Sequence, residues 1–215
     1  MSFKKTAGWA GMLAVAFFIL NLVLQGSTPA PEDSVADIRD YIANDVGVHK
    51  LGLLFGVLAV VPIVAFFAGF LLPFFKSDRE NGEGFGIVVF AGALMFGAAA
   101  TVLNTAYGTL ALRGGDGLND STLAAVWDMQ QVAAGGGGVA LTVFAGGVAM
   151  AVFRRHVMAD WVGWAATLLA ALGALGLITL TNEGNAAMLG YLPFLGFLLF
   201  VLAVSVDMVR STSDA

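Results

Sequence analysis

The sequence predicts an all-α membrane protein, a bundle of six transmembrane helices. Of its 215 residues, 59% are hydrophobic and only 12% are charged, and the mean hydropathy is +0.87. An ordinary soluble domain carries about 25% charged residues. A soluble core of this size could not bury so much apolar surface, so lipid must cover part of it. We expect one transmembrane domain that covers residues 1–215.

Six apolar stretches are long enough to cross a bilayer, which takes roughly 20 residues of helix. They lie near residues 8–25, 49–74, 85–112, 122–153, 161–181 and 187–209. The first stretch follows Lys4 and Lys5 and precedes Ser27, a pattern that resembles a cleavable signal peptide. Its apolar part is longer than a usual signal core, so we expect a signal anchor that stays as the first helix.

The basic residues predict that both termini are cytoplasmic, because cytoplasmic loops carry an excess of Lys and Arg. If the N-terminus is inside, more Lys and Arg residues lie on the inner side of the membrane than on the outer side. The inner group is Lys4, Lys5, Lys76, Arg79, Arg154, Arg155 and Arg210, and the outer group is Arg39, Lys50 and Arg113. The expected location is the plasma membrane, which in a bacterium is the inner membrane.

The first outer loop contains a candidate amphipathic helix between Pro31 and Ile42. Ser34 or Asp33 could cap its N-terminus, and Val35, Ile38 and Ile42 would share one face. We expect this helix to lie on the outer membrane surface or across the mouth of the bundle. A gating lid is the alternative.

The third and fourth spans are longer than a bilayer requires. Counting about 20 residues outward from the inner basic clusters leaves residues 106–112 and 122–133 beyond the membrane. They are joined by the glycine-rich turn 113–117. We therefore expect a helical hairpin that stands above the outer surface, and strong helix tilt is the alternative.

The middle of each predicted span lacks ionisable residues. The central stretches lie around Val15, Ala59, Phe96, Thr142, Ala171 and Leu198. Proton-coupled pumps and many ion transporters need ionisable groups at this depth, so the pattern argues against those classes. Backbone carbonyls at broken helices could still bind ions.

Polar residues instead gather at the predicted outer third of the spans, and they form the candidate site. We single out Asn21, Gln25, His49, Asn104, Tyr107, Trp127, Asp128 and Gln131. Asn182, Glu183 and Asn185, between the last two spans, lie near the same level. One interpretation is an outward-open pocket for a small molecule, a lipid headgroup or a partner segment. The simpler interpretation is that these residues hydrogen-bond helix ends at an interface.

The sequence predicts no catalytic centre, metal site or cofactor. There are no cysteines, which excludes disulfides and thiolate chemistry. His49 and His156 fall on opposite predicted membrane surfaces, so together they cannot ligate a haem; a single-histidine haem or chlorin site at His49 stays open. His49 and Asp128 could exchange a proton if they lie close together. The acidic residues lie mostly in loops, and we expect no nucleic-acid partner.

Glycines in the fourth span predict close helix packing. They are Gly135, Gly136, Gly137, Gly138, Gly146 and Gly147. A broken, ligand-binding helix is the alternative. Pro62 and Pro193 are expected to kink the second and sixth spans.

Two stretches of the sequence resemble a known group of proteins. They are the start of the fifth span on the inner side, Asp160–Trp164, and the last apolar stretch, Gly196–Phe200. With these features the chain resembles the small six-helix membrane proteins of unknown function of actinobacteria. The resemblance implies a six-helix fold and no particular activity.

Three functions from different classes remain. The first is a non-catalytic membrane subunit or assembly factor that packs against a partner chain or a second copy. The second is an outward-facing binder or carrier of a lipid or small apolar molecule. The third, which we favour least, is a membrane enzyme that uses His49 and Asp128.

Overall fold

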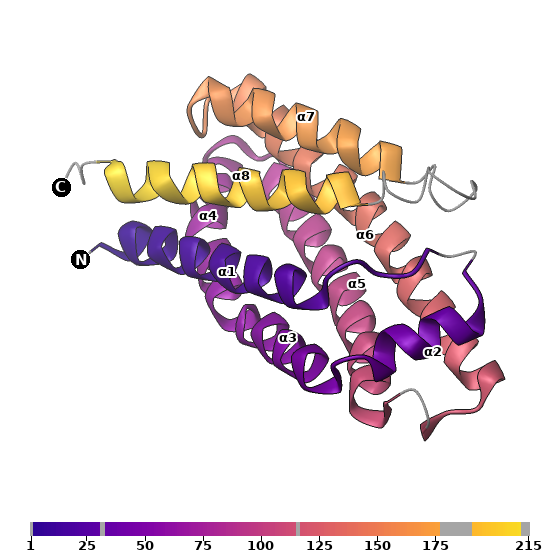
Figure 1. Ribbon diagram of the computed structural model, residues 1–215. Coiled ribbons are helices and arrows are strands. Elements are labelled where there is room, and N and C mark those ends of the chain that lie inside the picture. Colours follow the sequence, from indigo (N-terminus) through magenta and orange to yellow (C-terminus); the bar gives the residue numbers. More distant parts are fainter. Residues whose placement is uncertain (1, 31–32, 115–116, 177–190, 212–215) are drawn as a thin grey trace.

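The computed structural model describes residues 2–30, 33–114, 117–176 and 191–211, and these residues are predominantly helical. The helices are arranged side by side, and the N- and C-terminal ends lie at the same end of the molecule (Figure 1). The helices are α1 (Phe3–Gln25), α2 (Val35–Ala43), α3 (Val46–Leu58), α4 (Val60–Asn81), α5 (Phe85–Arg113), α6 (Asp120–Arg155), α7 (Asp160–Gly176) and α8 (Tyr191–Arg210).

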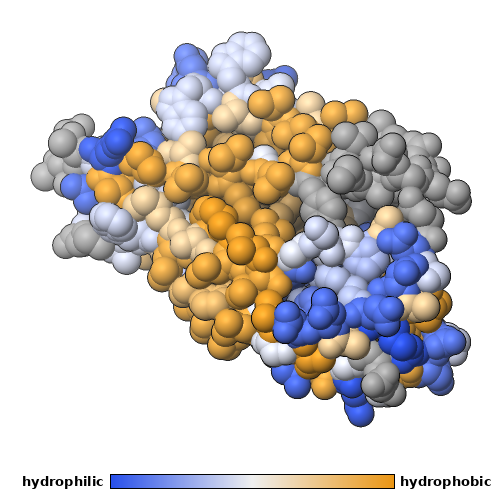
Figure 2. All heavy atoms as spheres, viewed as in Figure 1, coloured by the Kyte–Doolittle hydropathy of each residue, from blue (hydrophilic) through white to orange (hydrophobic). Residues whose placement is uncertain are grey.

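Five helical segments in the described part of the chain are long and apolar enough to cross a membrane, as expected of a multi-pass membrane protein. They are Phe3–Gln25, Val46–Asn81, Phe85–Arg113, Asp120–Arg155 and Leu192–Arg210. Helix α7 is apolar but shorter, and the end of the predicted fifth span, residues 177–181, lies outside the described residues. Six spans therefore stay a prediction. Figure 2 shows a broad apolar surface with hydrophilic residues gathered towards its two ends.

The second predicted span consists of two helices, because the helix is interrupted at Ala59, between α3 and α4. Pro62 has no N–H to donate to the carbonyl four residues earlier, and its ring crowds that carbonyl. The expected kink at Pro62 is thus confirmed. Pro193 instead lies in the first described turn of α8, where proline is tolerated. Residues 187–190, the predicted start of the sixth span, lie outside the described residues, so the kink at Pro193 stays a prediction.

Helix α4 runs to Asn81, past the end of the predicted span at residue 74. The charged residues after Pro73 end the apolar stretch but not the helix, which stops at Gly82 in the left-handed conformation (φ 68°). The extension has a structural role. The Asp78 carboxylate accepts a 2.7 Å hydrogen bond from the Gly86 N–H, and so satisfies a free donor in the first turn of α5.

Phenylalanine rings form the centre of the main core. Phe66, Phe70 and Phe74 on α4 are all fully buried. Phe70 contacts Phe144 of α6 and Phe200 of α8, with ring centroids 6.0 Å apart in each pair. These tilted and edge-to-face contacts are favourable ring geometries. They join three helices at the end of the molecule nearer to the chain termini.

A second, smaller apolar cluster lies at the opposite end and is built around α2. Ile38 and Ile42 of α2 pack with Leu110 of α5 and with Leu123 and Trp127 of α6. Helix α2 begins with Ser34, which forms a reciprocal capping box with Asp37. The predicted amphipathic helix and its Ser34 cap are therefore confirmed, and its apolar face covers the ends of α5 and α6.

Helices α5 and α6 contain 29 and 36 residues, which corresponds to lengths of about 44 Å and about 54 Å. Both exceed the hydrocarbon core of a bilayer, about 30 Å thick. The ion pair from Arg39 of α2 to Asp120 at the start of α6 (2.7 Å) fastens α2 to the tip of the hairpin. The separate cluster and this ion pair support a hairpin tip that extends beyond the apolar region.

Candidate functional site

His49 is the centre of the polar residues beneath α2. It lies on α3 and is only 5% exposed. Its Nδ1 atom is 2.8 Å from the Tyr107 hydroxyl of α5, and its Nε2 atom is 2.9 Å from the Tyr41 carbonyl oxygen of α2. Because a carbonyl oxygen only accepts, Nε2 donates to Tyr41 and Nδ1 accepts from the Tyr107 hydroxyl. The imidazole thus joins three helices.

Asn21 and Gln25 join α1 to the same region. The Asn21 side chain is 7% exposed and donates to the Gly52 carbonyl of α3 at 2.7 Å. Gln25 donates to the Asn21 side-chain oxygen at 3.0 Å, and the Tyr41 hydroxyl donates to the Gln25 carbonyl at 2.9 Å. We call Asn21, Gln25, Tyr41, His49 and Tyr107 the outer polar network. It links α1, α2, α3 and α5 through hydrogen bonds.

Asn104 of α5 lies close to the outer polar network, next to α3. Its amide donates to the Ala100 carbonyl one turn earlier at 2.8 Å. A Cβ on Gly56 would lie 3.1 Å from both the Asn104 side-chain oxygen and the Asn21 side-chain nitrogen. The absence of a side chain at Gly56 therefore lets two amide groups from different helices approach α3.

Two polar groups on α6 are buried without hydrogen-bond partners among the described residues. They are Nε1 of Trp127 and the side-chain oxygen of Gln130. The Trp127 ring packs edge-on to Tyr41 at 6.1 Å between centroids. An unpartnered buried polar atom costs about 1–3 kcal/mol.

Asp128 does not join His49. Its side chain is exposed, because adjacent residues in a helix differ in direction by about 100° and Trp127 takes the buried direction. Both ring nitrogens of His49 are engaged elsewhere. The described contacts therefore give no support to a His49–Asp128 proton exchange. Gln131 is half-buried, and Asn182, Glu183 and Asn185 lie outside the described residues.

No group of three potential metal ligands occurs in the part of the chain that the structure describes. His156 is exposed and faces Asp160, 3.3 Å away. The buried polar residues of the described chain are Asn21, His49, Gln130 and Ser205. Asp, Glu, Lys and Arg are absent from that group. The outer polar network thus contains none of these four residue types, and its hydrogen bonds hold the helices in register.

The glycines of α6 fall into two classes. A Cβ on Gly138 would lie 2.8 Å from the Gly173 carbonyl of α7, and a Cβ on Gly147 would lie 3.1 Å from the Val89 side chain of α5. At these two positions backbones approach closely, as expected. Gly135 and Gly137 are buried as well, and Gly137 has only ordinary van der Waals neighbours.

Gly136 and Gly146 differ from Gly137, Gly138 and Gly147 on the same helix, because a Cβ there would meet no atom of the described residues within 4 Å. The described residues therefore do not supply the expected packing at these two positions. They share a face of α6 with exposed apolar side chains at alternating spacings of three and four. This α6 face comprises Ala125, Met129, Val132, Gly136, Val139, Val143, Gly146 and Met150. Such spacing is that of a helix seam that packs against another helix.

Sequence reasoning missed Tyr41, Gly52 and Gly56. Tyr41 lies between Ile38 and Ile42 in the predicted amphipathic helix, and its position in the sequence did not distinguish it from the apolar face. Gly52 and Gly56 lie one turn apart on α3, the spacing of small residues at helix contacts, and that signal could have identified them. Comparison with protein-family models gives no match, and comparisons with curated proteins and with solved structures give no significant match.

Proposed function

We propose that the chain is a non-catalytic integral membrane protein that assembles with a second membrane chain, another copy or a different subunit, through the α6 face. The observation that carries the proposal is the pair of open glycines, Gly136 and Gly146. A glycine in a helix interior costs about 1 kcal/mol relative to alanine. Nothing in the described chain requires a glycine at either position, whereas a closely packed partner helix would.

The rest of α6 supports this assignment. Met129, Val132 and Met150 are each more than 40% exposed along the same face. Lipid also covers apolar side chains, but it does not need small residues at regular spacing. By the predicted span, the part of this face from Gly136 to Met150 lies within the bilayer, where a partner helix could lie along it. The six-helix, actinobacterial-like resemblance fits the proposal without adding an activity.

The carrier and enzyme hypotheses receive less support. The outer polar network is joined by its own hydrogen bonds, so its donors and acceptors serve helix contacts. Asp128 is exposed and makes none of these hydrogen bonds. No observation on the described residues favours the carrier or the enzyme over the subunit.

The test replaces both open glycines, Gly136→Leu with Gly146→Leu, in the full chain. After gentle extraction, native mass spectrometry measures the fraction of chain bound to a partner or to a second copy. We expect the assembled fraction to fall while the helix content of the single chain is unchanged. The matched control is Gly97→Leu on α5, which also meets no described atom within 4 Å and lies off the α6 face.

Two outcomes contradict the proposal. One is a wild-type chain that is isolated without a protein partner or second copy. The other is an assembled fraction that is the same in the double variant, the control and the wild type. A mass shift by another protein names a heteromeric subunit, and a doubled mass shows a homo-oligomer.

A further inference from the structure

A cavity of about 300 Å³ opens at the end of the molecule that holds the chain termini. It lies far along the helices from the outer polar network, and apart from two lysines its lining is apolar. Phe70 and Met208 in its wall are fully buried. The lining residues are Lys4, Gly69, Phe70, Leu72, Pro73, Lys76, Met158 and Met208.

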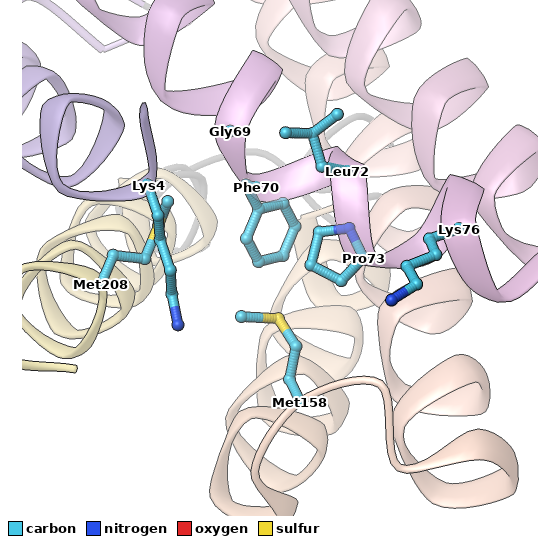
Figure 3. Close-up of a pocket in the computed structure, with 8 residues that line it drawn as sticks. All are labelled: Lys4, Gly69, Phe70, Leu72, Pro73, Lys76, Met158 and Met208. Atoms are coloured by element: carbon cyan, nitrogen blue, oxygen red, sulfur yellow. The ribbon is translucent and has the colours of Figure 1, made fainter. Parts of the chain in front are cut away.

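The two lysines come from different helices. Lys4 lies at the start of α1, and Lys76 lies near the end of α4. Figure 3 shows them on either side of the cavity, with Phe70 and Pro73 between them and Met158 opposite. Carboxylates are absent from the described lining. Lys76 has one acidic neighbour, Glu80, at 3.9 Å, and both side chains are mostly exposed, so this pair is weak.

We propose that this cavity binds an anionic phospholipid, with the phosphate between Lys4 and Lys76 and the upper part of an acyl chain against Phe70, Pro73 and Met158. Charge complementarity selects an anion for the rim, and the apolar wall selects a hydrocarbon for the interior. A soluble anion satisfies only the first requirement. Basic pockets between membrane helices on the cytoplasmic side commonly take such headgroups, and the predicted topology places this end in the cytoplasm. The site is independent of the α6 face.

The experiment uses the full chain in a mild detergent with equal amounts of dioleoyl phosphatidylglycerol and dioleoyl phosphatidylcholine, which differ only in the headgroup. Native mass spectrometry measures the ratio of the two bound lipids. We expect phosphatidylglycerol to be preferred by about 25-fold, since each of the two basic side chains at an anionic lipid surface contributes roughly a factor of five. The variant Lys4→Gln with Lys76→Gln should bring the ratio close to one, and Lys4→Arg with Lys76→Arg should retain the preference.

The control variant is Lys50→Gln with Arg113→Gln, which removes the same charge from the opposite end of the chain. Equal loss of preference in this control overturns the proposal, because it would show an effect of net charge alone. So does a wild-type ratio near one. Competition by glycerol 3-phosphate as effective as that by phosphatidylglycerol also overturns it, since the apolar cavity would then be unused. Glu80→Gln should increase the preference, because it removes the anion that competes for Lys76.

Discussion

Alanine substitution at Gly136 and Gly138 should have opposite effects on the stability of the single chain. Both glycines lie within the same stretch of α6, so replacing either one brings the same gain in helix propensity, about 1 kcal/mol. A Cβ on Gly138 would lie 2.8 Å from the Gly173 carbonyl, whereas a Cβ on Gly136 would meet no described atom within 4 Å. The neighbour of Gly138 is backbone, so α6 and α7 must separate to admit a methyl group.

Overpacking of this kind costs about 1–3 kcal/mol. Because the propensity gain is common to both variants, it cancels in their difference. The free energy of unfolding of Gly138→Ala should therefore be about 1–3 kcal/mol below that of Gly136→Ala, and Gly136→Ala should equal or exceed the wild type.

The assay is a denaturant titration of each purified variant in the same mild detergent, followed by circular dichroism of the helices. The protein concentration must be low enough for the single chain to dominate, because Gly136 lies on the proposed interface. Equal unfolding free energies for the two variants would refute the reasoning, since they would show that the α6–α7 backbone contact is not close.

Three further predictions concern buried and paired polar groups. His49→Phe keeps an aromatic ring but removes both hydrogen bonds of the imidazole and leaves the buried Tyr107 hydroxyl without that partner, so the unfolding free energy should fall by about 1–3 kcal/mol; no loss in a denaturant titration contradicts it. Ser205→Ala removes a fully buried hydroxyl that has no described partner, so stability should be unchanged or rise by about 1 kcal/mol, and a clear fall in the same titration would show a missed hydrogen bond. The hydrogen bond from Arg155 lowers the pKa of Glu83 below its ordinary value of 4.5. Because the pKa of Glu83 is lower in the folded state than in the unfolded state, this pair stabilises the fold fully above about pH 4.5. The stabilisation is lost as the pH falls through the lowered pKa. Thermal midpoints measured between pH 6 and pH 3 should therefore fall less steeply for Glu83→Gln than for the wild type, and parallel curves argue against the pair.

The sequence predicted the long helices well where hydropathy changes sharply. The start of α5 at Phe85 and the capping box of α2 follow from local composition, because a glycine-rich loop and a Ser–x–x–Asp pattern are local signals. The end of α4 was not predictable in this way. Charged residues leave the bilayer but can continue a helix, so hydropathy marks the membrane boundary and not the helix end.

The sequence could predict which polar residues lie at this end of the helices, but not which hydrogen-bond partners they have. Hydropathy shows the depth of His49, Asn21 and Asp128, and depth does not fix direction around the helix axis. Trp127 and Asp128 are neighbours in sequence, yet one is 1% exposed and the other faces outward. Their directions depend on which face of α6 packs under α2, and that contact joins segments distant in the chain.

The distribution of contacts bears on the choice between a carrier and a subunit. Hydrogen bonds through His49 and Asn21 hold α1, α2, α3 and α5 together at one end, and phenylalanine packing around Phe70 joins α4, α6 and α8 towards the other. A carrier needs helices that separate to admit its cargo, and opening the bundle at either end would break several of these contacts at once. The α6 face takes part in none of these hydrogen bonds or ring contacts within the described chain. Contact with another helix there would bury apolar surface without disturbing either end, which is the arrangement that a membrane subunit requires.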